Sequence, residues 1–258
     1  MRTNHPDAVD VEELSGVAVV RVGDGTRRNA LTTHGWNTLH EAAKRLSARA
    51  DLLAVVVRGR GHTFCAGSDL NEWDGADGAT VDASFAAMEA ALQAVEAIPA
   101  PTLAVVQGAA TGAGCQLALA CDTQLLARTA VVGMPVARLG ILLSPAFTTR
   151  LTLRVGPART KELLYSGRVL GADEAAGIGL FSRVVDDAKL EDEVDALLTS
   201  WRSQPGSALR AAKAAVDKGL EPLNHAARHR PPAPSSDRAE MPPRIRRFLL
   251  QTQARRTA

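Results

Sequence analysis

The stretch GAATGAGCQLALACD, residues 108–122, decides the fold and raises the question of what approaches its backbone. Six small residues run from Ala109 to Gly114 and lead into an apolar helical pattern, in which Gln116 is the one large polar side chain near the start. Because the apolar run TLAVVQ (102–107) precedes it, the stretch predicts a strand that turns into a helix. Small residues let a ligand come close to the main chain, and the N–H groups and dipole of a helix N-terminus favour negative charge.

A second corner of this kind is predicted at HTFCAGSDLNEW, residues 62–73. Two such corners that face each other could hold one oxygen atom between two backbone N–H donors, which is an oxyanion hole. Close packing alone explains the small residues at least as well, and both interpretations stay open at this point. The glycines at 108, 112 and 114 form no GxGxxG pattern, so they do not indicate a dinucleotide site.

Alternating strands and helices extend outward from these corners. VAVVRV (17–22) and LLAVVVRG (52–59) are typical of buried strands, and apolar residues between them recur at helical spacing. This order predicts a βαβ unit and a parallel sheet, hence an α/β fold. Further elements are expected as a helix over 82–98, strands over 102–107 and 123–127, and a helix that Ser144 caps and Pro145 begins.

The C-terminal part is predicted to be mostly helical. We expect an α/β core over residues 1–155 and a helical region over 156–258 that ends in an Arg- and Pro-rich tail. Within this region Asp173 is expected to cap a helix, RHRPPAPSS (228–236) to be a linker, and MPPRIRRFLLQ (241–251) to form a short last helix.

Composition is that of an ordinary soluble globular protein, with 46% hydrophobic and 22% charged residues. Only 3% of the residues are aromatic, so the core must consist mainly of Ala, Val and Leu. The three cysteines show no metal-ligand spacing and fit reduced cytosolic thiols. The N-terminus has no apolar signal core, and no stretch approaches a membrane span. We therefore expect a cytoplasmic protein with neither metal nor membrane association.

The C-terminal tail is basic, with eight arginines against two acidic residues over 226–258, whereas the whole chain carries a formal net charge of +2. Such a tail could bind nucleic acid or anionic lipid, but a solvated extension is the favoured interpretation. The tail has no aromatic residues interleaved with basic repeats, so no nucleic-acid partner is expected.

Four motifs together resemble one known family: RRNAL (27–31), FCAGSDL (64–70), the stretch 108–122, and P-x-x-x-L-G-I (135–141). They are similar in order and spacing to the enoyl-CoA hydratase/isomerase (crotonase) superfamily. The resemblance covers residues 12–220, and SSDRAEMPPRIRRFL resembles the family's final helix. It implies a spiral of ββα units with a helical C-terminal trimerisation region, assembled as a homotrimer or homohexamer. It also implies an acyl-CoA thioester ligand and no permanently bound cofactor, with coenzyme A present only as part of that ligand.

The resemblance assigns roles to individual positions. The backbone N–H groups of Ser68 and Ala113 match the oxyanion-hole donors, and the Ala113 methyl group, where most members have Gly, would narrow the site. The positions that match the coenzyme A binding segments are Arg27, Arg28, Ala30, Leu31, Ala66, Asp69, Leu70 and, on the last helix, Phe248.

Two catalytic positions depart from the family pattern. Hydratases of the family use two glutamates, which would stand at Gln116 and Val136. Gln exchanges no proton at neutral pH and Val has no polar side-chain atom. Since positioned proton-transfer groups contribute ~10²–10⁴-fold to rate, standard hydration is expected to be lost.

Three functions therefore stay open: an enzyme with non-standard enolate chemistry, such as an isomerase, decarboxylase or thioesterase-like protein; a non-catalytic acyl-CoA carrier or sensor; and a hydratase with displaced catalytic groups.

Five other side chains have a functional and a structural interpretation, and the structural one is favoured for all of them except Arg138. Ser144 matches a position that carries a carboxylate in some members, but is expected to be a helix cap. Asp69 could lie near the ligand, His62 could bind a metal, and Cys115 could have a lowered thiol pKa. Arg138 could pair with a carboxylate on the substrate or point to solvent.

Overall fold

The central sheet has six strands in the order β1-β2-β3-β4-β6-β9. All of its pairs are parallel except β1 with β2, which form an antiparallel hairpin. The computed structural model describes residues 9–228 and 233–257. Its strands are β1 (Asp10–Leu14), β2 (Val17–Val22), β3 (Ala54–Gly59), β4 (Thr102–Val106), β5 (Ala109–Thr111), β6 (Thr123–Ala127), β7 (Val131–Gly133), β8 (Val169–Gly171) and β9 (Arg183–Val185).

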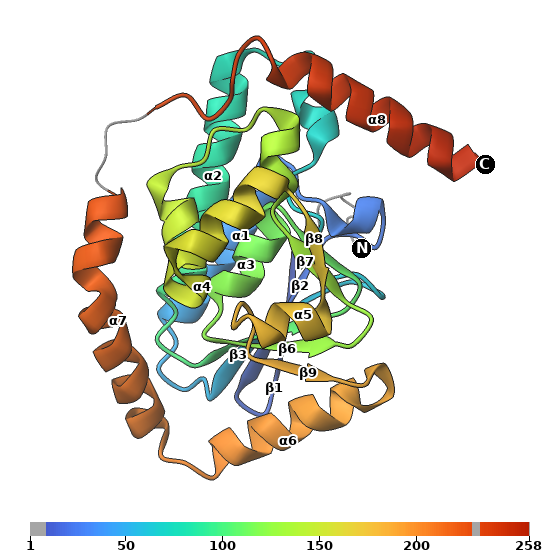
Figure 1. The fold of residues 1–258 in the computed structure, drawn as a ribbon. Coiled ribbons are helices and arrows are strands. Elements are labelled where there is room, and N and C mark those ends of the chain that lie inside the picture. The colour runs from blue at the N-terminus through green and yellow to red at the C-terminus, as the bar shows by residue number, and fades with distance from the viewer. Residues whose placement is uncertain (1–8, 229–232, 258) are drawn as a thin grey trace, which may run out of the picture.

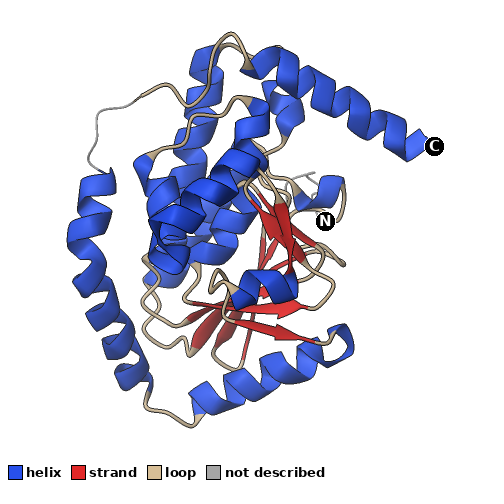
Figure 2. Cartoon of the chain, in the orientation of Figure 1, coloured by secondary structure: helices blue, strands red, loops and turns tan. Residues whose placement is uncertain are grey.

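A second, three-stranded sheet has the order β5-β7-β8 and continues from the end of β4. Figures 1 and 2 show α1 to α4 above the central sheet and α6 beneath it. The helices are α1 (Thr33–Ser47), α2 (Gly78–Glu96), α3 (Ala113–Ala120), α4 (Pro145–Ser166), α5 (Ala172–Gly177), α6 (Leu190–Arg202), α7 (Gly206–Arg228) and α8 (Met241–Thr257). Short 3₁₀ turns are η1 (Arg27–Asn29), η2 (Leu70–Trp73), η3 (Pro135–Leu139) and η4 (Asp187–Lys189).

The main core lies between the central sheet and helices α1 to α4, and it is built largely from Ala, Val and Leu as the low aromatic content predicts. Every residue of α3 is buried, which explains its continuous apolar sequence. A smaller cluster fills the other face of the sheet, where Leu190 and Val194 of α6 pack against Leu103 and Leu125. The predicted α/β fold with a largely parallel sheet is confirmed.

Several predicted boundaries differ from the structure. Asp173 is not a cap: Gly171 precedes α5, and Asp173 lies in its first turn and forms an ion pair with Arg128. Helix α4 runs on to Ser166 through a non-helical residue at Gly156. Helix α8 is longer than expected, and part of the predicted linker lies outside the described residues.

The division of the chain near residue 155 stays a prediction. Core residues continue past this position, because Leu163, Leu170 and Leu180 belong to the main cluster. Figure 1 shows α7 along the left edge of the molecule and α8 projecting from its upper right.

Candidate functional site

The two predicted corners lie directly against each other. Cys65 and Ala110 form an isolated parallel bridge, in which Cys65 N donates to Ala109 O at 2.9 Å and Thr111 N donates to Cys65 O at 3.1 Å. A methyl group built on Gly67 would lie 2.9 Å from the backbone nitrogen of Ala113. The main chains at 67–68 and 112–113 therefore lie side by side, too close for a side chain at position 67.

Some of the small residues at the corners serve packing. A methyl group on Gly114 would overlap the carbonyl group of Cys65, so only glycine permits this contact. Gly112 is required for a different reason. There is room for a methyl group, whose nearest neighbour would lie at 3.9 Å, but the backbone has φ of 55° and ψ of −124°. Residues with a side chain rarely adopt this conformation. Gly112 thus sets the direction in which α3 starts.

Two backbone donors at these corners have no acceptor. Ser68 pairs with Leu31 in a parallel bridge whose hydrogen bonds run through the flanking residues: Leu31 N donates to Gly67 O, and Asp69 N donates to Leu31 O, both at 2.8 Å. The N–H of Ser68 therefore points away from Leu31. Ala113 is the first residue of α3, so its N–H has no partner within the helix. Within residues 9–228 and 233–257, neither N–H group donates a hydrogen bond.

The side chain of Ser68 is fixed from two helices. Trp36 Nε1 of α1 donates to Ser68 Oγ at 3.1 Å, and Ser68 Oγ lies 3.8 Å from the sulfur of Met88 on α2. Trp36 is fully buried. Trp36 is one of the apolar residues at helical spacing between the strands at 17–22 and 52–59, and that spacing does not predict this polar contact.

Gln116 lies one helical turn beyond Ala113 and is fully buried. Its Nε2 donates to the carbonyl oxygen of Phe147 at 3.2 Å and lies 3.6 Å from the sulfur of Met134. Its Oε1 has no hydrogen-bond partner. Neither contact titrates, so the structure gives Gln116 no acid–base partner there.

Val136 and Ser144 lie on the connection between the small sheet and α4. Val136 is on η3 and is buried, with 7% of its surface exposed, the same fraction as Ala113. Ser144 is exposed, and its Oγ accepts a hydrogen bond from Phe147 N at 3.3 Å as the N-cap of α4. The predicted cap is confirmed.

A match to a known family model covers most of the chain. The model described as enoyl-CoA hydratase/isomerase matches residues 12–231. The chain belongs to this family.

Individual relatives agree with the assignment to the crotonase superfamily. A probable enoyl-CoA hydratase of Mycobacterium tuberculosis is 35% identical over 215 residues, which are 83% of each chain. The mitochondrial methylglutaconyl-CoA hydratase of Rattus norvegicus is 32% identical over 81% of this chain and 68% of its own. A solved structure of an enoyl-CoA hydratase/carnithine racemase from Magnetospirillum magneticum superimposes with a TM-score of 0.80, at 30% identity over 86% of this chain and 87% of that one. Family members with these names are enzymes.

The segment that resembles the family's coenzyme A binding motif has an unusual backbone. Arg27, Arg28 and Asn29 all have positive φ, at 46°, 55° and 55°. Asn29 holds this turn, because its Nδ2 donates to Arg60 O and Thr63 O at 2.9 and 2.6 Å. Such backbone strain persists only where the surroundings fix it. The turn exposes the side chain of Arg28 and buries Ala30 and Leu31 beside Ser68.

Asp69 is occupied inside the protein. Its carboxylate accepts from Asn71 N at 3.1 Å as the cap of η2 and forms an ion pair with Arg27 Nη1 at 2.5 Å. This geometry supports the structural interpretation of Asp69. The same ion pair engages one guanidinium nitrogen of Arg27. Ala66 and Leu70, on either side of Ser68, are both half-buried.

Three other candidates have exposed side chains. Phe248 on α8 is 47% exposed and does not belong to the cluster of Trp73, Met241 and Ile245 that anchors this helix. His62 is exposed, and Arg138 is exposed with its Nη2 3.5 Å from Ser166 O. In the described ranges no three His, Cys, Asp or Glu side chains gather as a metal site, and no helix has the length and apolar character needed to cross a bilayer.

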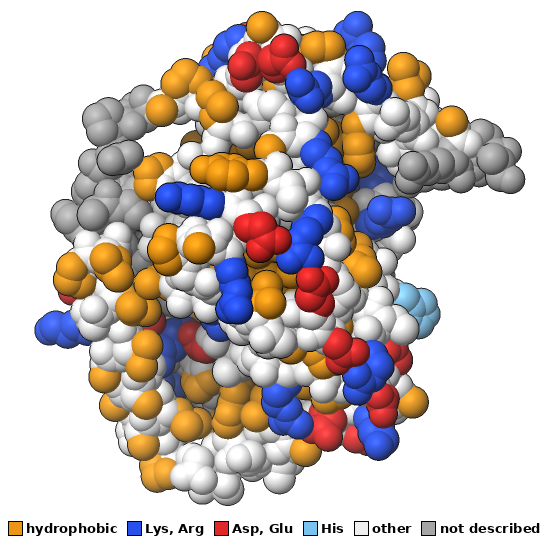
Figure 3. Space-filling view, in the orientation of Figure 1, with side chains coloured by type: hydrophobic (Ala, Val, Ile, Leu, Met, Phe, Trp, Pro, Cys, Tyr) orange, Lys and Arg blue, Asp and Glu red, His pale blue; other side chains and the backbone are white. Residues whose placement is uncertain are grey.

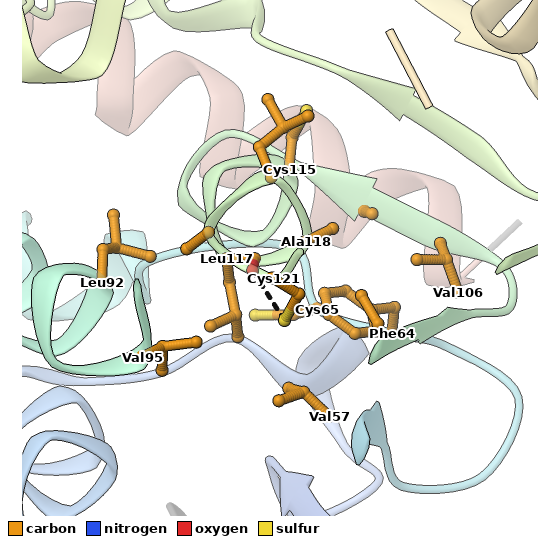
Figure 4. Packing of buried hydrophobic residues seen from close by; sticks show 14 of the residues in the cluster. Val57, Phe64, Cys65, Leu92, Val95, Val106, Cys115, Leu117, Ala118 and Cys121 are labelled. Carbon is orange, nitrogen blue, oxygen red and sulfur yellow. Dashed lines mark hydrogen bonds between the residues drawn. The ribbon is translucent and has the colours of Figure 1, made fainter. Parts of the chain in front are cut away.

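The cysteines are packing residues. Figure 4 shows Cys65, Cys115 and Cys121 among apolar side chains, with the Cys121 thiol directed at Leu117 O. Burial raises the pKa of Cys65 and of Cys115 to about 12. The alternative of a lowered thiol pKa at Cys115 is therefore wrong, because desolvation outweighs the proximity of the helix N-terminus.

Proposed function

We propose that the chain binds an acyl-CoA thioester whose carbonyl oxygen accepts hydrogen bonds from Ser68 N–H and Ala113 N–H. The proposal rests on one observation. The N–H groups of Ser68 and Ala113 have no acceptor, and they lie on two corners that contact each other. The start of α3 adds its dipole to the Ala113 donor, so negative charge on the oxygen is stabilised. Coenzyme A is present only as part of the ligand, and its binding along Arg28, Ala30, Leu31, Ala66 and Leu70 belongs to the same proposal.

The chemistry follows from Gln116 and Val136. The family resemblance aligns both with the hydratase glutamates, and the contacts of Gln116 are a main-chain carbonyl and a thioether. The site retains enolate stabilisation without the usual acid and base, so it supports non-standard chemistry of the lyase or isomerase type. Non-catalytic binding of acyl-CoA is the second candidate, and the same two residues favour it.

The hydration assay tests the catalytic part. We expect wild-type protein to hydrate crotonyl-CoA at least ~10⁴-fold more slowly than a standard member, because both proton-transfer groups are absent. Gln116→Glu with Val136→Glu should restore part of the rate, while each single change restores little. Loss of conjugated-thioester absorbance is the measurement. Rapid loss with wild-type protein, with formation of the 3-hydroxyacyl product, would instead identify a hydratase with displaced groups.

A matched pair of variants tests binding. Ser68→Pro removes the backbone donor, and Ser68→Ala keeps it. We expect Ser68→Pro to weaken butyryl-CoA binding by roughly 1–3 kcal/mol, and Ser68→Ala, which keeps the donor but loses the hydroxyl contact with Trp36, to weaken it by a smaller amount. Equal dissociation constants for the two folded variants would contradict the oxyanion assignment.

The proposal also includes assembly of the chain into a homotrimer or homohexamer. Helix α7 exposes Val216 and Leu223, and Figure 3 shows hydrophobic side chains along the lower left edge, over this helix. A second copy of the chain that covers this face would give the trimer or hexamer typical of the family. A cytoplasmic location, and the absence of metal and nucleic-acid partners, stay predictions.

A further inference from the structure

A buried arginine joins helices α2 and α4. Arg150 of α4 is 8% exposed, and its guanidinium group faces two carboxylates of α2. Its Nη1 and Nη2 donate to Glu89 at 3.1 and 2.7 Å, while its Nε and Nη2 donate to Glu96 at 2.6 and 3.2 Å. Glu89 and Glu96 are seven residues apart, so they lie on one side of α2 and on different turns. One side chain therefore fixes α4 against two turns of α2.

The contacts of Arg150 determine geometry more than they add stability. Desolvation of a buried ion pair offsets much of its attraction, so apolar residues of similar size often stabilise a fold equally well. Apolar residues cannot reproduce direction, because a planar guanidinium group that binds carboxylates through paired hydrogen bonds permits only one arrangement. Burial lowers the pKa of Arg150, but the two carboxylates outweigh this effect and raise it above the ordinary value, so the group stays charged.

On the α2 side, these contacts lead to the first of the two proposed oxyanion donors. Met88 directly precedes Glu89, and its sulfur lies 3.8 Å from Ser68 Oγ. Movement of α2 would displace this sulfur and with it one support of Ser68. Arg150 therefore acts on Ser68 through the adjacent turn of α2.

On the α4 side, the contacts lead to the second donor. Phe147 lies three residues before Arg150, and its carbonyl oxygen accepts a hydrogen bond from Gln116 Nε2 at 3.2 Å. Gln116 belongs to α3, which begins at Ala113 and packs against both α2 and α4. The position of α4 thus affects where the N–H of Ala113 lies.

We propose that Arg150 is a positioning residue, which keeps the N–H groups of Ser68 and Ala113 directed at the same thioester oxygen. The proposal rests on the acyl-CoA binding proposed above and adds the residue that aligns its two donors. The two carboxylates engage the guanidinium group, so Arg150 acts through the helices and not on the ligand. Alignment matters because donors that are already directed at the oxygen need no reorganisation when negative charge develops there.

Two ligands that differ only at the carbonyl group test this role. Butyryl-CoA has the thioester oxygen, and S-butyl-CoA, the corresponding thioether, lacks it. In calorimetric titration we expect wild-type protein to bind butyryl-CoA about tenfold more tightly than S-butyl-CoA, because only the thioester gains the hydrogen bonds. A triple variant, Arg150→Met with Glu89→Leu and Glu96→Leu, removes the three charges together and should bring the two affinities close to each other. Arg150→Lys keeps the charge without the paired hydrogen bonds and should give an intermediate ratio.

Lys213→Met is the matched control, because it also breaks an ion pair of a buried cation. The Lys213 side chain is 9% exposed and binds Asp122 at 2.9 Å, beyond the end of α3 that lies opposite Ala113. We expect this variant to have a lower melting temperature and an unchanged ratio of affinities. Infrared difference spectra of butyryl-CoA with a carbon-13 carbonyl give a second readout. The carbonyl band should lie at lower frequency in the wild type and the control than in the triple variant, because aligned donors polarise the carbonyl group.

The outcomes separate this inference from the function on which it rests. If wild-type protein binds the two ligands equally, or binds neither, the oxyanion assignment fails. If the folded triple variant and Arg150→Lys keep the full preference for butyryl-CoA, Arg150 has a structural role alone, while acyl-CoA binding stands. A loss of preference that Lys213→Met shares would also overturn the positioning role. If the triple variant does not fold, Arg150→Lys decides, and an unchanged ratio and carbonyl band would contradict the proposal.

Discussion

The hydroxyl group of Ser68 has partners on two different helices, and this determines how its main-chain N–H is held. Trp36 of α1 donates to it, and it contacts the sulfur of Met88 on α2. An oxyanion donor is effective only when its direction is fixed before the ligand arrives. We therefore infer that Trp36 is a positioning residue, which acts on the ligand through Ser68.

A double-mutant cycle tests this role. Trp36→Phe removes the indole donor, and we expect it to weaken butyryl-CoA binding about three- to tenfold. In a Ser68→Ala background the same change should have little further effect, because the hydroxyl group is already gone. Dissociation constants for the four proteins are the measurement. Trp73→Phe is the matched control, since the Trp73 Nε1 has no partner to lose. Fully additive losses at Trp36 and Ser68 would contradict the coupling.

At the scale of elements, α8 packs on the protein at its beginning and exposes large apolar side chains further along. Asp82 of α2 accepts from Ser235 N at 3.0 Å and pairs with Arg238, while Met241 and Ile245 pack on Trp73 and Val81. Beyond this anchor, Phe248 and Leu250 are 47% and 60% exposed. We therefore infer that the Asp82 contacts contribute to the attachment of this helix beside its apolar packing.

Attachment of α8 should depend on pH. Burial raises the pKa of Asp82, but the hydrogen bonds from Ser235 and Arg238 outweigh this effect and lower it below its ordinary value of 3.8. A lowered pKa stabilises the folded contact above that ordinary value, and the contribution is lost as pH falls further. We expect hydrogen exchange of α8 to accelerate relative to α1 below about pH 4. Asp82→Asn should accelerate it at pH 7, whereas Glu12→Gln, on exposed β1, should not. Unchanged exchange in Asp82→Asn would show that apolar packing alone holds the helix.

At the scale of the whole molecule, α7 is bound to the core along one side only. Lys213 Nζ lies 2.9 Å from Asp122, and Arg210 Nη1 donates to Leu52 O at 2.8 Å. The remaining surface is rich in alanine and includes Val216, which is 63% exposed. Apolar patches of this kind mark interfaces more often than free surface.

Light scattering should therefore give a mass of three or six times 27.2 kDa. Val216→Arg places a charge on the proposed interface and should shift the protein toward smaller species at micromolar concentration. Leu14→Arg, at a side chain 74% exposed on β1, is the control and should leave the mass unchanged. A concentration-independent monomer in the wild type would contradict the proposed assembly.

The limits of prediction from the sequence follow from the range of each interaction. Strands 17–22 and 123–127 are confirmed because several β-branched or leucine residues form one buried run. Strands β5, β7, β8 and β9 have three residues each, too few for any periodicity, and β1 is mostly exposed. The small residues indicated two corners, whereas the contact between the corners is shown by the structure. The Trp36–Ser68 contact joins residues 32 apart, so no local pattern predicts it.

The burial of all three cysteines has a practical consequence for spectroscopy. The folded surface offers maleimide reagents no thiol of its own, because each sulfur lies inside the main core. A single cysteine introduced at exposed Leu250 would then carry a fluorophore or nitroxide at one known place on α8. The emission or the spin mobility of that label could follow the helix while ligands bind, without first removing a native residue.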